Sequence, residues 1–232
     1  GFPANGPEAD NRPMTLRYAL AGASGLVGRE LARQVSADRQ CTELHLLLRR
    51  PLPALEALPQ AQAVAWGSCA MPALPRIDTA LCALGTTMAT AGSQAAFRAV
   101  DYDAVLAFAQ AARRAGAKRF GLVSALGADA ASAVFYNRTK GEVEQAVSQL
   151  GFKHLVIVRP SLLLGNRAAL GQPPRLTESL AQWFAPALTW ITPRRLQPVR
   201  AETVAKALLA VLANAPAGVR LVESDELHRL GS

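Results

Sequence analysis

The stretch AGASGLVGRE, residues 21–30, decides the fold, because it places three glycines at a regular spacing between an apolar run and a helical pattern. The run before it, residues 16–21, is typical of a buried strand, and Val27, Leu31 and Val35 recur as on one face of a helix. The glycines therefore lie on a strand-to-helix turn, where unpaired N–H groups and the helix dipole favour an anion. A tight turn without a ligand is the alternative.

Each glycine of this turn has its own use in binding a diphosphate. Gly22 would permit the tight turn, Gly25 would let the backbone approach the phosphates, and Gly28 would let the helix pack close to the strand. The spacing is G-x-x-G-x-x-G rather than G-x-G-x-x-G, because Ser24 stands two positions after Gly22. The sequence predicts a dinucleotide site formed by Gly22, Ser24, Gly25, Leu26, Val27 and Gly28.

Short apolar runs alternate with helical patterns along the rest of the chain. The runs are at 44–48, 63–66, 80–84, 120–124 and 155–158, with helical patterns over 102–115, 137–150 and 201–212 and a last strand at 219–222. This alternation predicts a parallel sheet with crossover helices on both faces. The expected fold class is α/β, a Rossmann-like doubly wound parallel sheet with a small C-terminal lid region.

The domain organisation follows from composition. Residues 1–13 are polar and rich in Gly, Pro and Asn, so we expect a disordered leader or a remnant of cloning there. Residues 14–232 are expected to form a single NAD(P)-binding Rossmann domain, with a lid-like segment at about 166–198. Three roles are open for the aromatic residues of this segment: packing of the lid onto the sheet, lining of an apolar pocket, or contact with a membrane surface. These residues are Trp183, Phe184 and Trp190.

The net charge of +8 does not by itself indicate a nucleic-acid partner. The basic pairs fall in different elements without interleaved aromatic residues, which favours a solvated surface and a site for a small anionic ligand. No apolar run approaches the length of a membrane span, and we expect no membrane-spanning segment.

Cysteine and histidine usage predicts neither a disulfide framework nor a metal site. The cysteines are odd in number and lack metal-like spacing, and the histidines fall on separate elements. Reduced thiols in or near the core predict a cytoplasmic protein. The residues concerned are Cys41, Cys69, Cys82, His45, His154 and His228.

The residues after the second strand bear on the choice of cofactor. NAD-binding proteins usually place an Asp or Glu about 20 residues past the glycines, to hold the ribose hydroxyls. Here the stretch LLLRRP, residues 46–51, has no carboxylate and offers Arg49 and Arg50, whose guanidinium groups can pair with a 2'-phosphate. NADP(H) is therefore preferred over NAD(H), which stays possible. Two solvated arginines at a strand end are the alternative.

A tyrosine and a lysine supply the candidate chemistry. Tyr136 and Lys140 lie four residues apart at the start of a predicted helix, so both side chains project from one face. A lysine ammonium beside a phenol favours the phenolate, which makes Tyr136 a candidate general acid/base. Ser124, at the carboxyl end of the preceding strand, is placed to hydrogen-bond a substrate carbonyl.

Three stretches resemble one family: CALGTTMATAGSQAAFRAVDYD, LVSALGADAASAVFYNRTKGEVEQAV and VIVRPSLLLGNR. They are similar to the Tat-interacting protein family of atypical short-chain dehydrogenase/reductases, and the similarity runs from about residue 16 to the C-terminus. The resemblance implies an NADPH-binding protein with Ser124, Tyr136 and Lys140 at the catalytic positions. It also implies a cofactor loop at Gly85, Thr86 and Thr87 and a turn beside the nicotinamide at Arg159, Pro160 and Ser161.

One departure from the resemblance concerns the active-site asparagine of many superfamily members. The equivalent helix start is VDYD; Asp101 is a candidate substitute there, although a solvated helix N-cap is the favoured role for it. The expected function is a reductase that moves hydride between NADPH and a small carbonyl compound. The alternatives are a cofactor-binding regulatory protein with little turnover, which contacts a protein partner or forms a homodimer, and a nucleotide-sugar epimerase or dehydratase.

Overall fold

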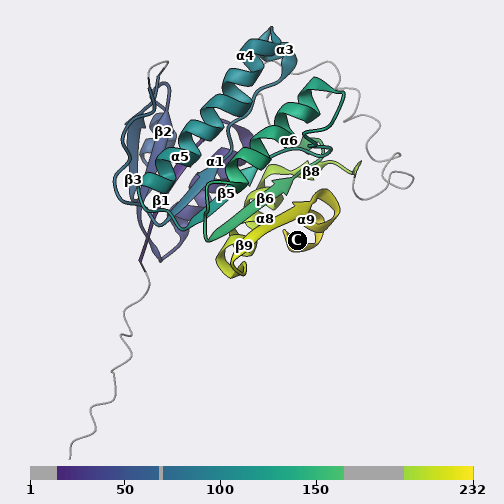
Figure 1. The fold of residues 1–232 in the computed structure, drawn as a ribbon. Coiled ribbons are helices and arrows are strands. Elements are labelled where there is room, and N and C mark those ends of the chain that lie inside the picture. The colour runs from purple at the N-terminus through teal and green to yellow at the C-terminus, as the bar shows by residue number, and fades with distance from the viewer. Residues whose placement is uncertain (1–14, 68–69, 165–195, 232) are drawn as a thin grey trace, which may run out of the picture.

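A single parallel sheet organises the protein. The computed structural model describes residues 15–67, 70–164 and 196–231, and seven strands in this part form a sheet in the order β3-β2-β1-β4-β5-β6-β9 (Figure 1). All neighbouring pairs in the sheet are parallel. The strands are β1 Leu16–Ala21, β2 Cys41–Leu48, β3 Ala61–Ala65, β4 Thr79–Cys82, β5 Arg119–Val123, β6 His154–Arg159 and β9 Gly218–Glu223.

Helices connect the strands and cover both faces of the sheet. They are α1 Leu26–Ala37, α2 Pro53–Glu56, α3 Met88–Ala91, α4 Gln94–Arg98, the π-helix η1 Ala99–Ala104, α5 Val105–Arg114, α6 Phe135–Ser148, α8 Ala201–Asn214 and α9 Ser224–Leu230. A separate short parallel pair is formed by β7 Leu163–Leu164 and β8 Val199–Arg200.

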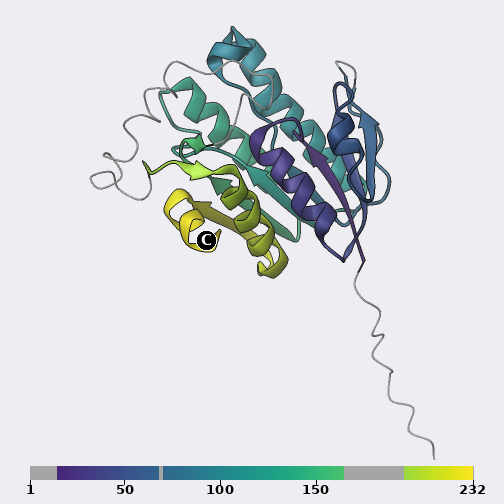
Figure 2. The same cartoon turned by 180° about the vertical axis from the view of Figure 1, so that it is seen from behind.

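Alternate residues of the inner strands enter two different cores. Leu20 and Val156 pack with α1 and α8, whereas Ala19 and Leu155 pack with α5 and α6. Figure 1 shows α5 and α6 in front of the sheet, and Figure 2 shows α1 and α8 on the opposite face. Strands buried on both faces explain why their sequences are nearly continuous apolar runs.

This architecture confirms the predicted α/β, doubly wound parallel fold. The leader and nearly all of the lid-like segment lie outside the described residues, so the domain boundaries stay a prediction. Cys41 and Cys82 are buried free thiols, whereas Cys69 lies outside the described residues. Among the helices of the described ranges, none combines the length and apolar character needed to cross a bilayer.

Candidate functional site

The glycine turn between β1 and α1 has two glycines that the protein itself requires. Gly22 has a φ of +89°, and a Cβ added to it would lie 2.4 Å from the backbone carbon of Ala83. A Cβ on Gly28 would lie 2.0 Å from the carbonyl oxygen of Gly22. Packing therefore excludes any side chain at these two positions.

Gly25 differs, because only the carbonyl oxygen of Gly22, 3.5 Å away, lies within 4 Å of its added Cβ. Gly25 is also the N-cap of α1 and offers no side chain to the first-turn N–H groups, which have no intrahelical acceptors. Open space beside unpaired N–H groups fits a diphosphate better than a turn without a ligand. The turn thus meets the geometric requirement for the predicted dinucleotide.

Lys140 and Asp101 form a buried ion pair at the carboxyl edge of the sheet. Lys140 Nζ lies 2.7 Å from Asp101 Oδ1, and the side chains are 7% and 0% exposed. The other carboxylate oxygen of Asp101 accepts a 2.8 Å hydrogen bond from the Thr86 N–H. A Cβ on Gly85 would contact both charged groups, at 3.4 and 3.6 Å. Asp101 therefore joins the loop after β4 to the lysine of α6.

The expectation that Asp101 is a solvated helix N-cap is wrong. The chain stays helical without interruption from α4 through η1 to α5, so Asp101 lies inside the π-helical turn rather than at a helix start. Its carboxylate is fully buried. Residues at π-helical turns often lie at functional sites, which agrees with the position of Asp101 beside Lys140.

The charge on Lys140 is maintained by its neighbours. Burial opposes the charged form, but the charge of Asp101, the adjacent Tyr136 and the hydrogen bond to Asp101 together raise the pKa of Lys140 above its usual value. The lysine therefore stays an ammonium at neutral pH. Tyr136 lies one turn before it on α6, and its ring packs against buried Phe97 with 5.3 Å between centroids.

Ser124 lies directly after β5, but its hydroxyl is already engaged. Ser124 Oγ donates a 2.5 Å hydrogen bond to Oε1 of Glu144, a buried carboxylate on α6. Arg159 holds the same carboxylate with two further bonds, Nε to Oε1 at 3.1 Å and Nη2 to Oε2 at 2.5 Å. The role of Ser124 toward a substrate stays a prediction, and Arg159 is engaged in an ion pair rather than free at the predicted cofactor turn.

The other predicted cofactor residues lie on the loops after β2, β4 and β6. Arg49 and Arg50 are exposed at the end of β2, and neither has an ion-pair partner among the described residues. Thr87 Oγ1 accepts the Thr90 N–H and so caps α3. Ser161 Oγ donates to the Gln197 carbonyl, and the carbonyl of buried Pro160 accepts from the Leu126 N–H.

Sequence reasoning missed Glu144 and undervalued Asp101. A signal for Glu144 was present, because Tyr136, Lys140 and Glu144 follow one another at intervals of four residues on α6. Asp101 had no such signal, since η1 interrupts the regular helical period. In the described ranges no cluster of three or more His, Cys, Asp or Glu side chains could hold a metal ion.

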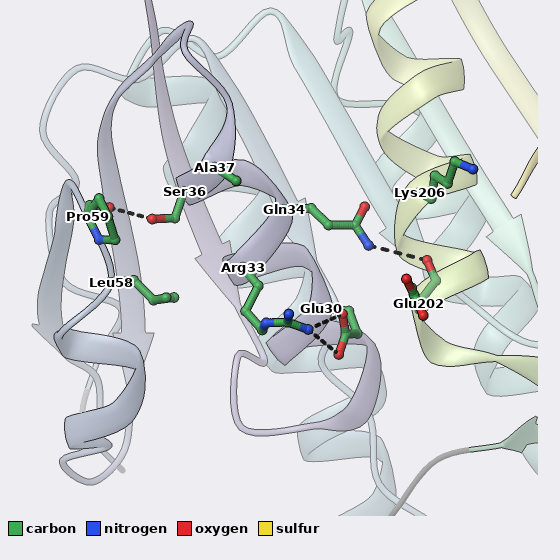
Figure 3. A pocket seen from close by; sticks show the side chains of 9 residues that line it. All are labelled: Glu30, Arg33, Gln34, Ser36, Ala37, Leu58, Pro59, Glu202 and Lys206. Atoms are coloured by element: carbon green, nitrogen blue, oxygen red, sulfur yellow. Dashed lines mark hydrogen bonds and ion pairs between the residues drawn. The ribbon is translucent and has the colours of Figure 1, made fainter.

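A surface hollow of about 400 Å³ lies elsewhere, over α1 and α8 (Figure 3). Its polar lining includes the Glu30–Arg33 ion pair and Gln34, whose amide donates to the Glu202 carbonyl. None of the predicted site residues lines it. The hollow is therefore separate from the candidate site.

Comparison with known proteins identifies relatives along most of the chain. A sequence profile of the family described as HIM1 matches residues 54–191. Protein fmp52, mitochondrial, of Emericella nidulans is 37% identical over 178 residues, covering 73% of this chain and 75% of the relative. Protein HTATIP2 of Rattus norvegicus is 33% identical over 220 residues, covering 91% of this chain and 88% of the relative.

Solved structures show the same fold at low sequence identity. MoeE5 in complex with UDP-glucose and NAD has a TM-score of 0.65 and 14% identity, with 93% of this chain and 80% of that chain covered. An ADP-L-glycero-D-manno-heptose-6-epimerase of Helicobacter pylori has a TM-score of 0.65 and 16% identity, with coverage of 92% and 78%. At this level of identity, the likenesses show a shared Rossmann-like α/β fold.

The relatives contradict our expectation of a cytoplasmic protein. The FMP52 relatives from Emericella nidulans, Candida albicans and Coccidioides immitis are all named mitochondrial. Buried free thiols, the basis of that expectation, occur in any reducing compartment, so cysteine usage could not separate these locations.

Proposed function

The chain belongs to the HIM1 family of atypical short-chain dehydrogenase/reductases, and from this premise we propose that it is an NADP(H)-dependent oxidoreductase acting on a small carbonyl substrate. The observation that carries the proposal is the buried Lys140–Asp101 pair, which lies one helical turn from Tyr136. A charged lysine is costly to bury, and a structural role alone is served better by apolar residues. Its position beside a phenol supports acid/base chemistry.

The cofactor would be held along the carboxyl edge of β1, β2 and β4. The turn from Gly22 to Gly28 would take the diphosphate, Arg49 and Arg50 the 2'-phosphate, and the loop from Gly85 to Thr87 the adjoining part of the cofactor. When bound, the nicotinamide supplies the hydride for reduction of a carbonyl and accepts it in the reverse direction.

Tyr136 then acts as the proton donor. As the carbonyl carbon gains the hydride, its oxygen takes the phenol proton of Tyr136, which yields the alcohol and leaves a phenolate. The Lys140 ammonium stabilises this phenolate, and Asp101 keeps the lysine charged and in place. Solvent returns the proton to Tyr136 after the alcohol leaves.

The test of this role is Tyr136→Phe, with Tyr102→Phe as the matched control. Tyr102 lies in η1, where its ring packs under the Arg98 guanidinium at 4.2 Å, a contact that a phenylalanine ring retains. We expect Tyr136→Phe to lower kcat for NADPH-dependent carbonyl reduction by about 10²–10⁴-fold with NADPH affinity unchanged, and Tyr102→Phe to change neither. Full activity in Tyr136→Phe would refute the acid/base role.

The cofactor preference has a separate test in calorimetric titration of NADPH and NADH. Arg49→Gln/Arg50→Gln removes the guanidinium groups at the end of β2, whereas Arg39→Gln removes an exposed one at the beginning of this strand. A charge-assisted hydrogen bond contributes about 1.5–3 kcal/mol, so we expect NADPH binding to weaken by about tenfold or more in the double variant only. Equal affinities for both cofactors in the unaltered protein would refute the assignment.

A substrate screen separates the oxidoreductase from the regulatory alternative. Aldehydes, ketones and quinones are offered with NADPH, and consumption of the cofactor is followed by its absorbance. Turnover of any carbonyl compound supports the proposal. Tight NADPH binding without turnover of any of them would instead favour a cofactor-binding regulatory protein.

A further inference from the structure

The Ser124 hydroxyl has one proton to donate, and the structure shows where it goes. Ser124 Oγ lies 2.5 Å from Glu144 Oε1, and both residues are buried. No described residue donates a hydrogen bond to Ser124 Oγ, so its lone pairs stay available for a donor. A serine in this arrangement accepts from further partners and does not donate to them.

Arg159 forms an ion pair with Glu144 and fixes its carboxylate in place. Both carboxylate oxygens of Glu144 accept from the guanidinium group, and the remaining Nη1 of Arg159 bonds Glu223 Oε1 at 3.0 Å. The hydrogen bond to Glu144 is the largest influence on Arg159 and raises the pKa of the guanidinium, so this partner stays protonated. The network ties α6, β6 and the end of β9 together.

A neutral substrate carbonyl competes poorly for the Ser124 proton. Hydrogen bonds to an ionised carboxylate are roughly twice as strong as those between neutral groups. Turning the hydroxyl toward a substrate would also leave one hydrogen-bonding site of buried Glu144 unsatisfied. The reacting carbonyl oxygen therefore depends on Tyr136 alone for its proton donor.

We infer that Glu144 is a positioning residue that fixes Ser124 as a hydrogen-bond acceptor. The site then selects a carbonyl substrate that carries a hydroxyl group on the carbon adjacent to the carbonyl carbon. This inference rests on the proposed oxidoreductase function and narrows its substrate class. A hydroxyl at that place donates to Ser124 Oγ while Tyr136 donates to the carbonyl oxygen. A substrate with a methyl group in its place leaves Ser124 without its partner.

The test compares hydroxyacetone with butanone, which has a methyl group in place of the hydroxyl. We expect kcat/KM of the unaltered protein with NADPH to favour hydroxyacetone by about tenfold or more. Ser124→Ala keeps the Glu144–Arg159 pair and should lose this preference mainly through hydroxyacetone. Glu144→Gln should lose it as well, because an uncharged amide no longer holds the serine proton.

Two further comparisons separate positioning from a general structural effect. Glu142→Gln is the matched control, since Glu142 lies on the same helix and pairs with Arg98 away from Ser124; it should leave the preference unchanged. In the double variant Ser124→Ala/Glu144→Gln, the preference should be no lower than in Ser124→Ala alone, because Glu144 acts through Ser124. The positioning role would be overturned if the losses of preference in the two single variants added in the double variant. It would also be overturned if Glu144→Gln lowered kcat/KM equally for hydroxyacetone and butanone.

The remaining outcomes distinguish this inference from the proposed function. Equal use of both ketones by the unaltered protein, with turnover that depends on Tyr136, overturns the inference and leaves the oxidoreductase intact. Lack of turnover with every carbonyl compound overturns the oxidoreductase, and the inference falls with it. Should Glu144→Gln fail to fold, Ser124→Ala alone decides, because retention of the hydroxyacetone preference in that variant contradicts the acceptor role.

Discussion

Replacing Asp101 with asparagine removes the counter-ion of Lys140 and little else. Asparagine has nearly the same size, and its amide oxygen can still accept the hydrogen bond that the Thr86 N–H donates at 2.8 Å. The change therefore isolates the 2.7 Å contact between the carboxylate and the ammonium. It leaves a lysine that is 7% exposed without a negative partner.

The size of the stability loss expected for Asp101→Asn follows from the burial of the ion pair. Removal of one partner of a buried ion pair costs about 3–5 kcal/mol, equivalent to a loss of about two to four powers of ten in the folding equilibrium constant. The Arg98–Glu142 pair is the contrast, because its side chains are 41% and 30% exposed. Glu142→Gln should lower the free energy of unfolding by less than about 1 kcal/mol.

The pH dependence gives a second signature. In the unaltered protein the pKa of Lys140 is raised, so its stabilising contribution is present below the unfolded pKa of about 10.4 and is lost as pH rises through the folded pKa. In Asp101→Asn burial should instead hold that pKa below its usual value. The unfolded state then binds more protons, and stability increases as pH rises toward about 10.4. The difference in the free energy of unfolding between the unaltered protein and Asp101→Asn should therefore become smaller at alkaline pH.

Urea unfolding at pH 7 and pH 9.5 measures both effects. The double variant Asp101→Leu/Lys140→Met replaces the pair with apolar side chains and should recover most of the lost stability while abolishing turnover. A loss below about 1 kcal/mol for Asp101→Asn, or a loss that does not change with pH, would refute the buried-pair argument. In either case Lys140 would have found solvent or another partner.

Two further predictions concern the glycine turn and the thiols. Gly28→Ala should lower the free energy of unfolding by about 1–3 kcal/mol or more, because its Cβ would lie 2.0 Å from a backbone oxygen. Gly25→Ala should change the free energy of unfolding by less than about 0.5 kcal/mol. It should nevertheless weaken NADPH binding, as measured by calorimetry. Unchanged NADPH affinity in Gly25→Ala would contradict a diphosphate at the turn. Burial raises the pKa of Cys82 to about 12 and that of Cys41 to about 11, so neither should react with iodoacetamide in the native protein at pH 8, as read by site-resolved mass spectrometry. Rapid native labelling of Cys82 would show that the core around β4 opens.

The fold was predictable because the inner strands of the sheet, β1, β2, β4, β5 and β6, are covered on both faces. Apolar runs therefore identified the strands. For example, β1 has the bounds of the apolar run that precedes the glycine turn, residues 16–21. The weak run at 63–66 became β3, an edge strand with little buried surface, which explains its faint signal. Helices α3 and α4 were missed because each has at most five residues, too few to show a period.

The candidate site was predictable only where its residues share one regular element. Tyr136 and Lys140 lie on one helix, so their spacing alone places both side chains on the same face. The partner of Lys140 lies 39 positions earlier, in a π-helical turn whose period differs from that of an α-helix. Local propensity assigned Asp101 to a cap, and tertiary packing overrode that preference.

Helix α6 links these features, because it positions both the buried lysine and the buried glutamate. Lys140 faces Asp101 below the loop after β4, and Glu144, one turn later, faces Ser124 and Arg159 at the ends of β5 and β6. Gly141 lies between them, and a Cβ there would come within 2.1 Å of the Ala130 backbone nitrogen. The loop after β5 thus packs directly on the helix backbone at this point. Two charged networks and this contact fall within five consecutive residues of α6, so the helix can neither slide nor rotate without breaking all three. The register of α6 against the sheet is therefore the main determinant of the site's geometry.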